Sequence, residues 1–400
     1  MKKSFLSGNE AIAEAVLLSG VKSIAAYPIT PQTGIVNRLA TLIMTRDLNT
    51  SMIHAESEFS ALSIVLGSTL GGVRSFTATS SQGLLMMSEA SYYASGMRIP
   101  LVMAVVNRGL SAPVTIFSDH QDSMSMRDNG WLQFYCKDGQ EALDTIITAY
   151  KIAEHRKVLL PIKVCIDGFF LSHLSEPVEI PSQTAINYFL PEFTANFPHM
   201  DIDDPKFLGT AAWPDYYEEF VFLRNKALTN AIAVIEEVST EYSEKVSQVT
   251  SLISTYRASD AEVVIVGLGA MMSTLEVAVD KMRGKGLLVG LLRIKCFRPF
   301  PNEQILNEIK GAKKLVILDR SLSPSQAGPV FLEISSLLHT SGLDIDCYGF
   351  ILGLGGRDIT KKTGEFILKK VNEMSPNTFE SRQFWLDVNH QTIKRWTSNE

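Results

Sequence analysis

Short apolar runs alternate with longer amphipathic segments along the first 170 residues of the chain. Each run is bounded by turn-forming residues, which is typical of buried strands. The segments between the runs carry apolar residues at the spacing of an α-helix. Buried strands that alternate with amphipathic helices predict a doubly wound α/β fold with a parallel sheet. The clearest strand candidates are residues 23–26, 51–54, 75–79, 101–106 and 161–166.

Two helices in this region can be placed in more detail. Ser7 and Glu10 have the spacing of a capping box, so we expect a helix to begin there. A second helix is expected over about residues 56–70. The side of this helix that faces the core is predicted to carry Phe59, Leu62, Leu66 and Leu70.

The pattern changes twice after residue 170. Residues 170–230 concentrate prolines and aromatic side chains, which indicates an excursion along the surface rather than another strand–helix unit. A charged helical pattern follows over about residues 217–254, and the apolar run VVIVGLG after residue 262 opens a second strand–helix series. We therefore expect two domains, residues 1–255 with the excursion and residues 256–400.

Composition and charge narrow the functional classes. Hydrophobic residues make up 46% of the 400-residue chain, which is enough for two buried cores and excludes a disordered protein. The net charge of −6 and the lack of clustered lysines and arginines argue against nucleic-acid binding. No apolar run is long enough to span a bilayer, so we expect no membrane association and a cytoplasmic protein.

The cysteines argue against several redox sites within this chain. There are four, they lie far apart, and none forms a CxxC pair. Zinc ribbons, thioredoxin-type motifs and cysteine-ligated iron–sulfur clusters all need closer sets. The four are Cys136, Cys165, Cys296 and Cys347.

The first candidate site loop follows the predicted strand at residues 23–26. Its sequence is YPITPQT, in which Pro28 and Pro31 restrict the backbone. Thr30 would then present its hydroxyl from a fixed position at the carboxyl end of a strand, where parallel sheets bind ligands. The alternative is a rigid turn that only precedes a helix.

The second candidate loop contains Glu56 and Glu58 at a strand-to-helix junction. Carboxylates in a first helical turn commonly complement the helix dipole, which is the structural alternative. The functional interpretation is a buried glutamate that exchanges a proton with a heterocyclic cofactor.

The third candidate loop runs from Asn107 to Asp122, after the most apolar strand. Arg108 stands at the strand end, where a guanidinium can bind a substrate carboxylate through two parallel hydrogen bonds or serve as a structural ion-pair partner. Asp119, His120 and Asp122 contain metal-ligand side chains, but their spacing matches neither an EF-hand nor a zincin. A hydrogen-bond network is therefore favoured over a metal site, and no metal is assigned to this chain.

Taken together, the three loops resemble the alpha subunit of the pyruvate:ferredoxin oxidoreductase family, also known as 2-oxoacid:ferredoxin oxidoreductases or pyruvate synthases. The resemblance covers most of the chain. The matching stretches are SGNEA from Ser7, YPITP from Tyr27, ESE from Glu56, NRGLSAP from Asn107, DHQD from Asp119, RDNGW from Arg127, the region from Asp204 to Tyr217, and CFRPFP from Cys296.

The resemblance implies a fold and roles for individual residues. The first domain would be a thiamine-diphosphate pyrimidine-binding domain and the second would be similar to the transketolase C-terminal domain. Glu58 would hydrogen-bond to N1′ of the aminopyrimidine, with Pro28 and Ile29 also at the cofactor. Thr30 and Arg108 would hold the carboxylate of the 2-oxoacid.

One expected motif is missing. Thiamine enzymes hold the diphosphate and Mg2+ with a Gly-Asp-Gly sequence, but here Asp167-Gly168 is preceded by Ile166. The resemblance therefore implies one subunit of a split enzyme that is inactive alone. A beta subunit would share the thiamine diphosphate and bring Mg2+, and gamma and delta subunits would bring the coenzyme A region and the iron–sulfur clusters.

The implied reaction is the reversible, coenzyme A-dependent oxidative decarboxylation of pyruvate to acetyl-CoA and CO2, with electrons passed to ferredoxin. The alternatives are the same chemistry on a branched-chain oxoacid, 2-oxoglutarate or oxalate, and a non-catalytic structural subunit. An oxalate-type site is expected to use an additional arginine in the loop at residues 27–33, and this loop contains none. Thr30 fits a small monocarboxylate such as pyruvate. An NAD-dependent enzyme would need a glycine-rich turn and a ribose-binding acid that the sequence does not contain.

Overall fold

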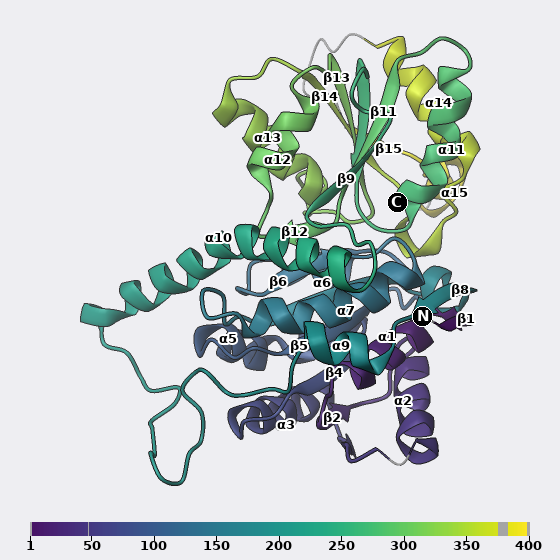
Figure 1. Cartoon of the computed structure of the whole chain (residues 1–400). Helices are drawn as coiled ribbons and strands as arrows, with labels where there is room; N and C mark the ends of the chain where they lie inside the picture. Colours follow the sequence, from purple (N-terminus) through teal and green to yellow (C-terminus); the bar gives the residue numbers. More distant parts are fainter. Residues whose placement is uncertain (1, 47, 375–382, 398–400) are drawn as a thin grey trace. The chain divides into compact units, whose positions relative to one another are not determined.

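The computed structural model describes residues 2–46, 48–374 and 383–397. The chain divides into two compact units (Figure 1). The first consists of Met1–Ser254 with two later segments, Leu268–Ala270 and Arg293–Ile305. The second consists of Thr255–Gly267, Met271–Leu292 and Leu306–Glu400.

The first unit is built on a seven-stranded sheet with the order β12-β6-β7-β5-β4-β2-β3. Strand β12 runs antiparallel to β6, and the other neighbouring strands are parallel. The predicted doubly wound parallel sheet is therefore confirmed. The strands are β2 (Ser23–Ala26), β3 (Ser51–His54), β4 (Ser75–Thr79), β5 (Val102–Asn107), β6 (Leu132–Tyr135), β7 (Ile162–Asp167) and β12 (Cys296–Arg298).

Helices connect these strands and cover the sheet. Every residue of β5 and of β7 is buried, as expected for central strands that are covered on both faces. The connecting helices are α1 (Gly8–Leu18), α2 (Thr33–Thr45), α3 (Glu58–Leu70), α4 (Ser81–Met86), α5 (Ser88–Gly96), α6 (Gln121–Ser125), α7 (Gly139–Glu154) and α8 (Phe170–His173). Because the strands are parallel, their carboxyl ends and the loops that follow meet at one edge of the sheet.

The start of α1 has the predicted capping box. The backbone N–H of Ser7 donates to Glu10 Oε2 at 2.9 Å, and the backbone N–H of Glu10 donates to Ser7 Oγ at 3.3 Å. These two bonds satisfy backbone groups that have no partner within the helix. The helix start is therefore encoded locally, by two residues three positions apart.

The predicted core side of α3 is wrong for one residue. Leu62 and Leu66 are buried, but Phe59 keeps 41% of its surface exposed. The buried stripe of α3 instead begins with Glu58 and continues through Ala61. Phe59 lies at the edge of this stripe, about 20° around the helix from Leu66, and it stands in the first turn of α3.

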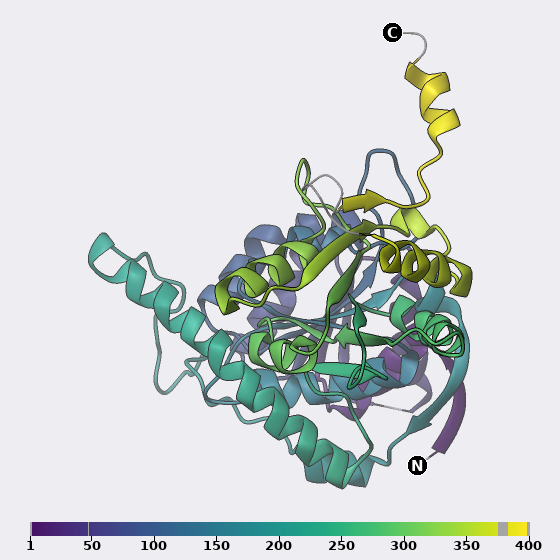
Figure 2. The same ribbon diagram turned by 90° about the horizontal axis from the view of Figure 1, so that it is seen from above.

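The segment from residue 170 to residue 245 contains more regular structure than expected. It comprises β8 (Ser175–Ile180), α9 (Gln183–Phe189) and α10 (Pro214–Lys245), and β8 pairs antiparallel with β1 (Lys2–Ser7) in a separate two-stranded sheet. The expected helix at 217–254 therefore begins earlier and ends earlier. Figure 2 shows α10 as one long continuous helix.

The second unit contains a six-stranded sheet with the order β15-β14-β13-β10-β11-β9. The pairs β10–β13, β13–β14 and β14–β15 are parallel. The strands are β9 (Ile253–Tyr256), β10 (Val263–Gly267), β11 (Val289–Ile294), β13 (Lys314–Asp319), β14 (Asp346–Ile351) and β15 (Gln383–Trp385). The helices are α11 (Met271–Arg283), α12 (Asn302–Ile309), α13 (Pro329–Ser341), α14 (Lys361–Asn372) and α15 (His390–Thr397), with a short 3-10 helix at Leu354–Gly356.

One part of the expected second domain belongs to the first unit. The segment Arg293–Ile305 contains β12, in which Cys296 pairs with Phe134 of β6. Arg293 also donates two hydrogen bonds, at 2.8 and 2.9 Å, to the buried carboxylate of Glu141 in α7. These contacts join residues that are far apart in the sequence, so local patterns do not predict them. They hold in the first unit a segment that is expected, from the sequence, in the domain spanning residues 256–400.

None of the described helices has the length and apolar character needed to cross a membrane.

Candidate active site

Glu58 is the first residue of α3 and stands directly after strand β3. The preceding Ser57 caps the helix, because its hydroxyl accepts a hydrogen bond from the backbone N–H of Ser60 at 3.2 Å. The cap directs Glu58 inward, and only 6% of its surface is exposed. No residue in the described part of the chain forms a hydrogen bond with its carboxylate.

Gly83 of α4 leaves the space that the Glu58 carboxylate occupies. A Cβ atom at position 83 would lie 2.6 Å from Glu58 Oε1 and 2.5 Å from Thr79 Oγ1, which is too close for either atom. The hydroxyls of Thr79 and Ser80 are buried and lack hydrogen-bond partners within the described residues. Buried polar groups without partners are costly. This group of atoms is therefore suited to a polar ligand, and a nitrogen heterocycle would offer Glu58 a partner.

Arg108 links the ends of three strands. It follows β5, and its guanidinium donates from Nη1 to the carbonyl oxygen of Thr30 and from Nη2 to Gln82 Oε1, both at 2.8 Å. Thr30 comes from the loop after β2, and Gln82 comes from the helix after β4. The structure therefore brings Thr30 and Arg108 together, through the carbonyl group of Thr30 rather than its hydroxyl.

The guanidinium of Arg108 can still bind an anion. Burial lowers the pKa of Arg108, and the nearby Asp122 carboxylate opposes this shift. An arginine remains charged at neutral pH in either case. Each terminal nitrogen carries two N–H groups, and the contacts described above use one on each. A substrate carboxylate could accept the remaining two in a bidentate arrangement.

The loop residues predicted at the cofactor have mixed exposure. Pro28 and Thr30 are exposed, and Ile29 is half-buried. Pro31, at the end of the same loop, is held by Asn9 of α1, whose side-chain amide donates to its carbonyl oxygen at 2.9 Å. The exposed part of this loop is therefore available to a ligand or a partner, whereas its end is fixed to the core.

Asp122 holds two of the strand-end loops in place. Its Oδ2 accepts hydrogen bonds from the backbone N–H groups of Ser81 and Arg108, at 2.9 and 3.0 Å. Its Oδ1 accepts from Asn107 Nδ2 and from the backbone N–H of Ser123, both at 2.7 Å. Burial raises the pKa of Asp122 to about 6, against the effect of these donors. The carboxylate thus connects the loop after β4 to the loop after β5.

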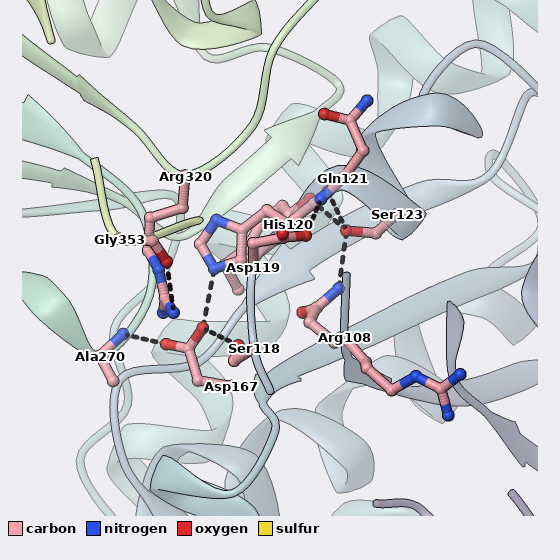
Figure 3. Close-up of polar contacts among 12 residues, drawn as sticks. Arg108, Ser118, Asp119, His120, Gln121, Ser123, Asp167, Ala270, Arg320 and Gly353 are labelled. Carbon is pink, nitrogen blue, oxygen red and sulfur yellow. Dashed lines mark hydrogen bonds and ion pairs between the residues drawn. The ribbon is translucent and has the colours of Figure 1, made fainter. Parts of the chain in front are cut away.

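His120 and Asp119 lie in different surroundings from Asp122. Figure 3 shows Ser118, His120 and the backbone N–H of Ala270 converging on the carboxylate of Asp167, with distances of 3.1, 2.9 and 3.0 Å. Asp119 Oδ1 accepts from the backbone N–H of Gln121 at 3.0 Å. The guanidinium of Arg108 points away from this cluster (Figure 3).

These contacts form a hydrogen-bond network of the kind favoured from the sequence. Asp167, the aspartate of the incomplete diphosphate motif, is a buried hydrogen-bond acceptor in this network. Among the described residues, no group of three or more His, Cys, Asp or Glu side chains is arranged to hold a metal ion.

Sequence reasoning missed the residues at the junction of β4 and α4. Gln82 accepts a hydrogen bond from Arg108, and Gly83 lies beside the carboxylate of Glu58. The signal was present, because a run of small polar residues, TSSQG, follows a buried strand at the edge where ligands bind. Ser81, in the same run, has a φ of +49°, a conformation that L-residues avoid unless surrounding contacts impose it.

Two family models match the chain. The model described as pyruvate flavodoxin/ferredoxin oxidoreductase, thiamine diphosphate-binding, matches residues 14–240. The model described as pyruvate:ferredoxin oxidoreductase core domain II matches residues 261–363.

Curated relatives match over almost their whole length. The chain is 46% identical to pyruvate synthase subunit PorA of Methanothermobacter thermautotrophicus over 365 residues, which cover 91% of this chain and 94% of that protein. It is 38% identical to PorA of Methanosarcina barkeri, covering 98% of both chains. Ketoisovalerate oxidoreductase subunit VorA of Pyrococcus horikoshii is also 38% identical and is covered to 98%.

A solved structure shares the fold. The 2-oxoglutarate:ferredoxin oxidoreductase of Magnetococcus marinus superposes with a TM-score of 0.71 at 18% identity, over 92% of this chain and 65% of that one. The chain therefore spans about two thirds of that longer polypeptide. The likeness concerns the fold, whereas the family models and the curated relatives show that the chain belongs to the pyruvate:ferredoxin oxidoreductase family.

Proposed function

We propose that this chain is the alpha subunit of a pyruvate synthase, which binds the pyrimidine ring of thiamine diphosphate and the carboxylate of pyruvate. The observation that carries the proposal is the buried Glu58 carboxylate, which has no partner among the described residues and faces the space left by Gly83. The whole enzyme would convert pyruvate and coenzyme A to acetyl-CoA and CO2, in either direction, with electrons passed to ferredoxin.

Glu58 acts on the pyrimidine. Thiamine diphosphate, when bound, supplies the carbanion chemistry that allows a 2-oxoacid to lose CO2. Glu58 would hold a proton against ring nitrogen N1′, because a buried carboxyl shares a proton most strongly with the one polar partner available to it.

Arg108 and the loop from β2 act on the substrate. The guanidinium is fixed by Thr30 and Gln82, so its remaining N–H groups keep one direction without a loss of side-chain entropy on binding. The fixed cation would hold the oxoacid carboxylate while the carboxylate is converted to CO2. Thr30, on the exposed part of the loop, would contact the same group with its hydroxyl.

Other subunits would complete the site. Apolar side chains with exposed surface lie on or beside the site loops, and a partner chain would cover them: Tyr27, Phe59, Met86, Ile116 and Phe117. We assign the diphosphate and its Mg2+ to a beta subunit because Ile166 replaces the first glycine of the usual motif. We assign the coenzyme A region and the iron–sulfur clusters to gamma and delta subunits.

The cysteines of this chain fit that division. All four are buried, and none of them is in a disulfide. Burial raises the pKa of the Cys136 thiol to about 12, and it raises the pKa of Cys165 and Cys296 further. Thiols in this state are poor metal ligands, since the thiolate is the form that binds.

A branched-chain 2-oxoacid is the second candidate substrate. It is favoured by the relative named ketoisovalerate oxidoreductase subunit VorA, which is 38% identical over 98% of the chain. Pyruvate is preferred because the relative with 46% identity is named a pyruvate synthase subunit. The two substrates differ only in the alkyl group, which Arg108 and Thr30 would not contact.

The test is a 2-oxoacid panel on the purified, assembled complex. Viologen reduction would be measured with pyruvate, 2-oxoisovalerate, 2-oxoglutarate and oxalate, each with and without coenzyme A. We expect the highest kcat/KM with pyruvate, full dependence on coenzyme A except for oxalate, and a large rise in KM for pyruvate in Arg108→Ala with unchanged affinity for thiamine diphosphate. Unchanged rates in Arg108→Ala and Glu58→Ala would leave a structural subunit as the remaining interpretation.

A further inference from the structure

Residues 200–223 form a projecting segment of the first unit, which we name the aromatic arm. The arm consists of a loop and the first turns of α10, and it extends beyond the helices that surround the sheet of this unit (Figures 1 and 2). Every residue from 201 to 223 is exposed except Leu208, which is half-buried. The arm also carries large apolar side chains: Met200, Ile202, Phe207, Trp213, Tyr216, Tyr217, Phe220, Val221, Phe222 and Leu223.

The degree of exposure is unusual for such residues. Ile202 and Phe207 expose 98% and 94% of their surfaces, and Trp213 exposes 74%. Single exposed apolar side chains are common on proteins, but a contiguous set marks a surface that another molecule covers. Aromatic residues in particular supply much of the binding energy of protein interfaces.

The arm is anchored at both ends. The backbone N–H of Met200 donates to the carbonyl oxygen of Leu70, at the end of α3, at 2.7 Å. Farther along, a Cβ on Gly209 would come within 3.0 Å of the sulfur of Met97. Helix α10 packs on α7, α5 and α9, and its buried residues lie between Ala227 and Tyr242. The first turns of α10 are therefore held in position by the rest of the same helix, which packs on the core.

The exposed and buried halves of α10 share one apolar face. At 100° per residue, Tyr216, Phe220 and Leu223 lie within about 60° of each other around the helix axis. The same face continues into the half that this chain covers. The buried side chains there are Ala227, Ala231, Val234, Ile235, Val238, Ser239 and Tyr242. One apolar stripe therefore runs along the helix, and this chain covers only its second half.

Charge indicates what covers the first half. Between residues 201 and 223 there are six carboxylates and one lysine. Two of the carboxylates, Asp215 and Glu219, flank the apolar stripe on one side, and Glu218 lies opposite the stripe. A surface that accepts the stripe in a groove would meet the flanking carboxylates at its rim, where lysines or arginines would complement them.

We propose that the aromatic arm docks, as a helix in a groove, onto a different subunit of the assembly whose groove is apolar and rimmed by basic side chains. A second copy of this chain is the less suitable occupant, because the chain is acidic, with a net charge of −6, and would bring a surface of like sign. The proposal requires that the chain works within an assembly of different subunits, as the proposed function implies, but not that Glu58 or Arg108 has a catalytic role.

The docking site can be located by crosslinking within the intact complex. Phe220 would be replaced by the photoreactive residue p-benzoylphenylalanine, and the irradiated, purified complex would be analysed by peptide mass spectrometry. We expect the crosslinked peptide to come from another subunit and to lie beside lysines or arginines. A crosslink to a second copy of this chain, or to this chain alone, would overturn the proposal.

The contribution to assembly can be measured with variants whose changes lie on the surface. The double variant Phe220→Ser, Leu223→Ser should raise the dissociation constant for the partner subunit by about 30-fold or more, as for loss of one interfacial hot spot. Glu218→Lys, Glu219→Lys should weaken binding most at low salt. Met44→Ser, an exposed apolar residue of α2 outside the arm, serves as the control and should bind normally.

The failure of this proposal can be told apart from failure of the proposed function. If the arm variants assemble with unchanged affinity, the docking proposal is wrong, whatever the complex catalyses. If they lose assembly and their isolated chain keeps the circular dichroism spectrum and Tm of the parent, the arm is an interface and the fold is intact. The catalytic assignment depends only on the oxoacid kinetics of complexes that have assembled.

Discussion

The Oδ2 atom of Asp122 accepts a hydrogen bond from the backbone N–H of Arg108 at 3.0 Å. The same atom accepts a second bond from the backbone N–H of Ser81, one residue before Gln82, which in turn holds the Arg108 guanidinium. Asp122 does not reach the proposed substrate itself. It fixes the two backbone segments that place the guanidinium, and it is therefore a positioning residue.

Asp122→Asn should impair substrate use more than cofactor binding. The amide keeps the size of the side chain but turns an N–H group toward donors that need an acceptor, so one backbone segment should shift. We expect kcat/KM for pyruvate to fall by about 10-fold or more, a loss near 1.4 kcal/mol, with little change in thiamine diphosphate affinity. Asp128→Asn, a substitution at an exposed carboxylate nearby, is the control and should behave as the parent.

Asp122 should also impose a pH dependence. Burial raises the pKa of Asp122 to about 6. Above that pH the carboxylate accepts its four hydrogen bonds, whereas below it the proton weakens its capacity to accept them. We expect kcat/KM of the parent complex to decline as the pH falls through about 6, and this decline to be missing in Asp122→Asn. A parent profile that is retained in the variant would assign the titration to another group.

Glu58→Gln tests the acid–base role directly. The amide retains the shape and polarity of the side chain but cannot exchange a proton with a ring nitrogen, so turnover should fall by roughly 100-fold or more while the fold is kept. Viologen reduction by the assembled complex measures this loss. Glu56→Gln, two residues earlier and exposed, is a matched control that should retain full activity. Equal losses in both variants would point to a general effect on the start of α3.

Gly83→Ala should displace Glu58 without unfolding the chain. The added Cβ would lie 2.6 Å from Glu58 Oε1, the end of a flexible side chain that can move away, and 2.5 Å from the buried Thr79 Oγ1, which must also shift. A displacement of the order of 1 Å at a reacting group can reduce the rate by about 100-fold. We therefore expect low turnover in a chain that stays folded but has a lower Tm.

The control for Gly83→Ala is a second glycine-to-alanine change in the same region. Gly67 lies in α3, and a Cβ there would meet nothing within 4 Å. Gly67→Ala should keep full activity and stabilise the protein by about 0.5–1 kcal/mol, since alanine is the better helix former. Normal turnover in Gly83→Ala would show that Glu58 is not confined as the structure indicates.

The sequence predicted those features that depend on neighbours along the chain. The strand at Ser75–Thr79 and the capping box of Ser7 and Glu10 follow from local patterns, and both are present. Glu58 and Arg108 became candidate site residues because a strand end and a loop sequence are local features as well. The same reasoning failed at Phe59, because a periodic pattern does not show whether another element covers a residue at the edge of the apolar stripe.

The remaining features depend on residues that are distant in the sequence. Strand β1 pairs with β8, about 170 residues later, and β12 joins the first sheet through β6 although it follows strand β10 of the second unit. Neither pairing leaves a local signal, because a strand does not specify its partner. The contact between Gly83 and Glu58 also joins residues that are distant in the sequence. It depends on β3 and β4 lying in the same sheet, which the local pattern does not specify.

Arg293 and Glu141 form the contact that most clearly holds the segment Arg293–Ile305 to the first unit. The guanidinium donates two hydrogen bonds to the carboxylate, and both side chains are almost fully buried. Arg293→Met should destabilise the first unit by about 3–5 kcal/mol, because Glu141 would be left as a buried charge beside an apolar side chain. Chemical denaturation followed by circular dichroism measures this loss. The ion pair between Arg283 and the exposed Asp260 supplies the control, Asp260→Asn, which should cost no more than about 1 kcal/mol.

The loss in Arg293→Met should depend on pH in a defined direction. Burial by itself would raise the pKa of Glu141, but Arg293 and Lys295 overcome this and hold it below its ordinary value. A carboxyl whose pKa is lower in the folded state contributes stability above its unfolded pKa, and this contribution disappears as the pH falls through the folded pKa. The parent should therefore lose stability in acid. The difference between parent and variant should be largest near neutral pH and shrink below about pH 4. A difference that stays constant well below pH 4 would show that packing of the arginine side chain, rather than its charge, holds this segment in the first unit.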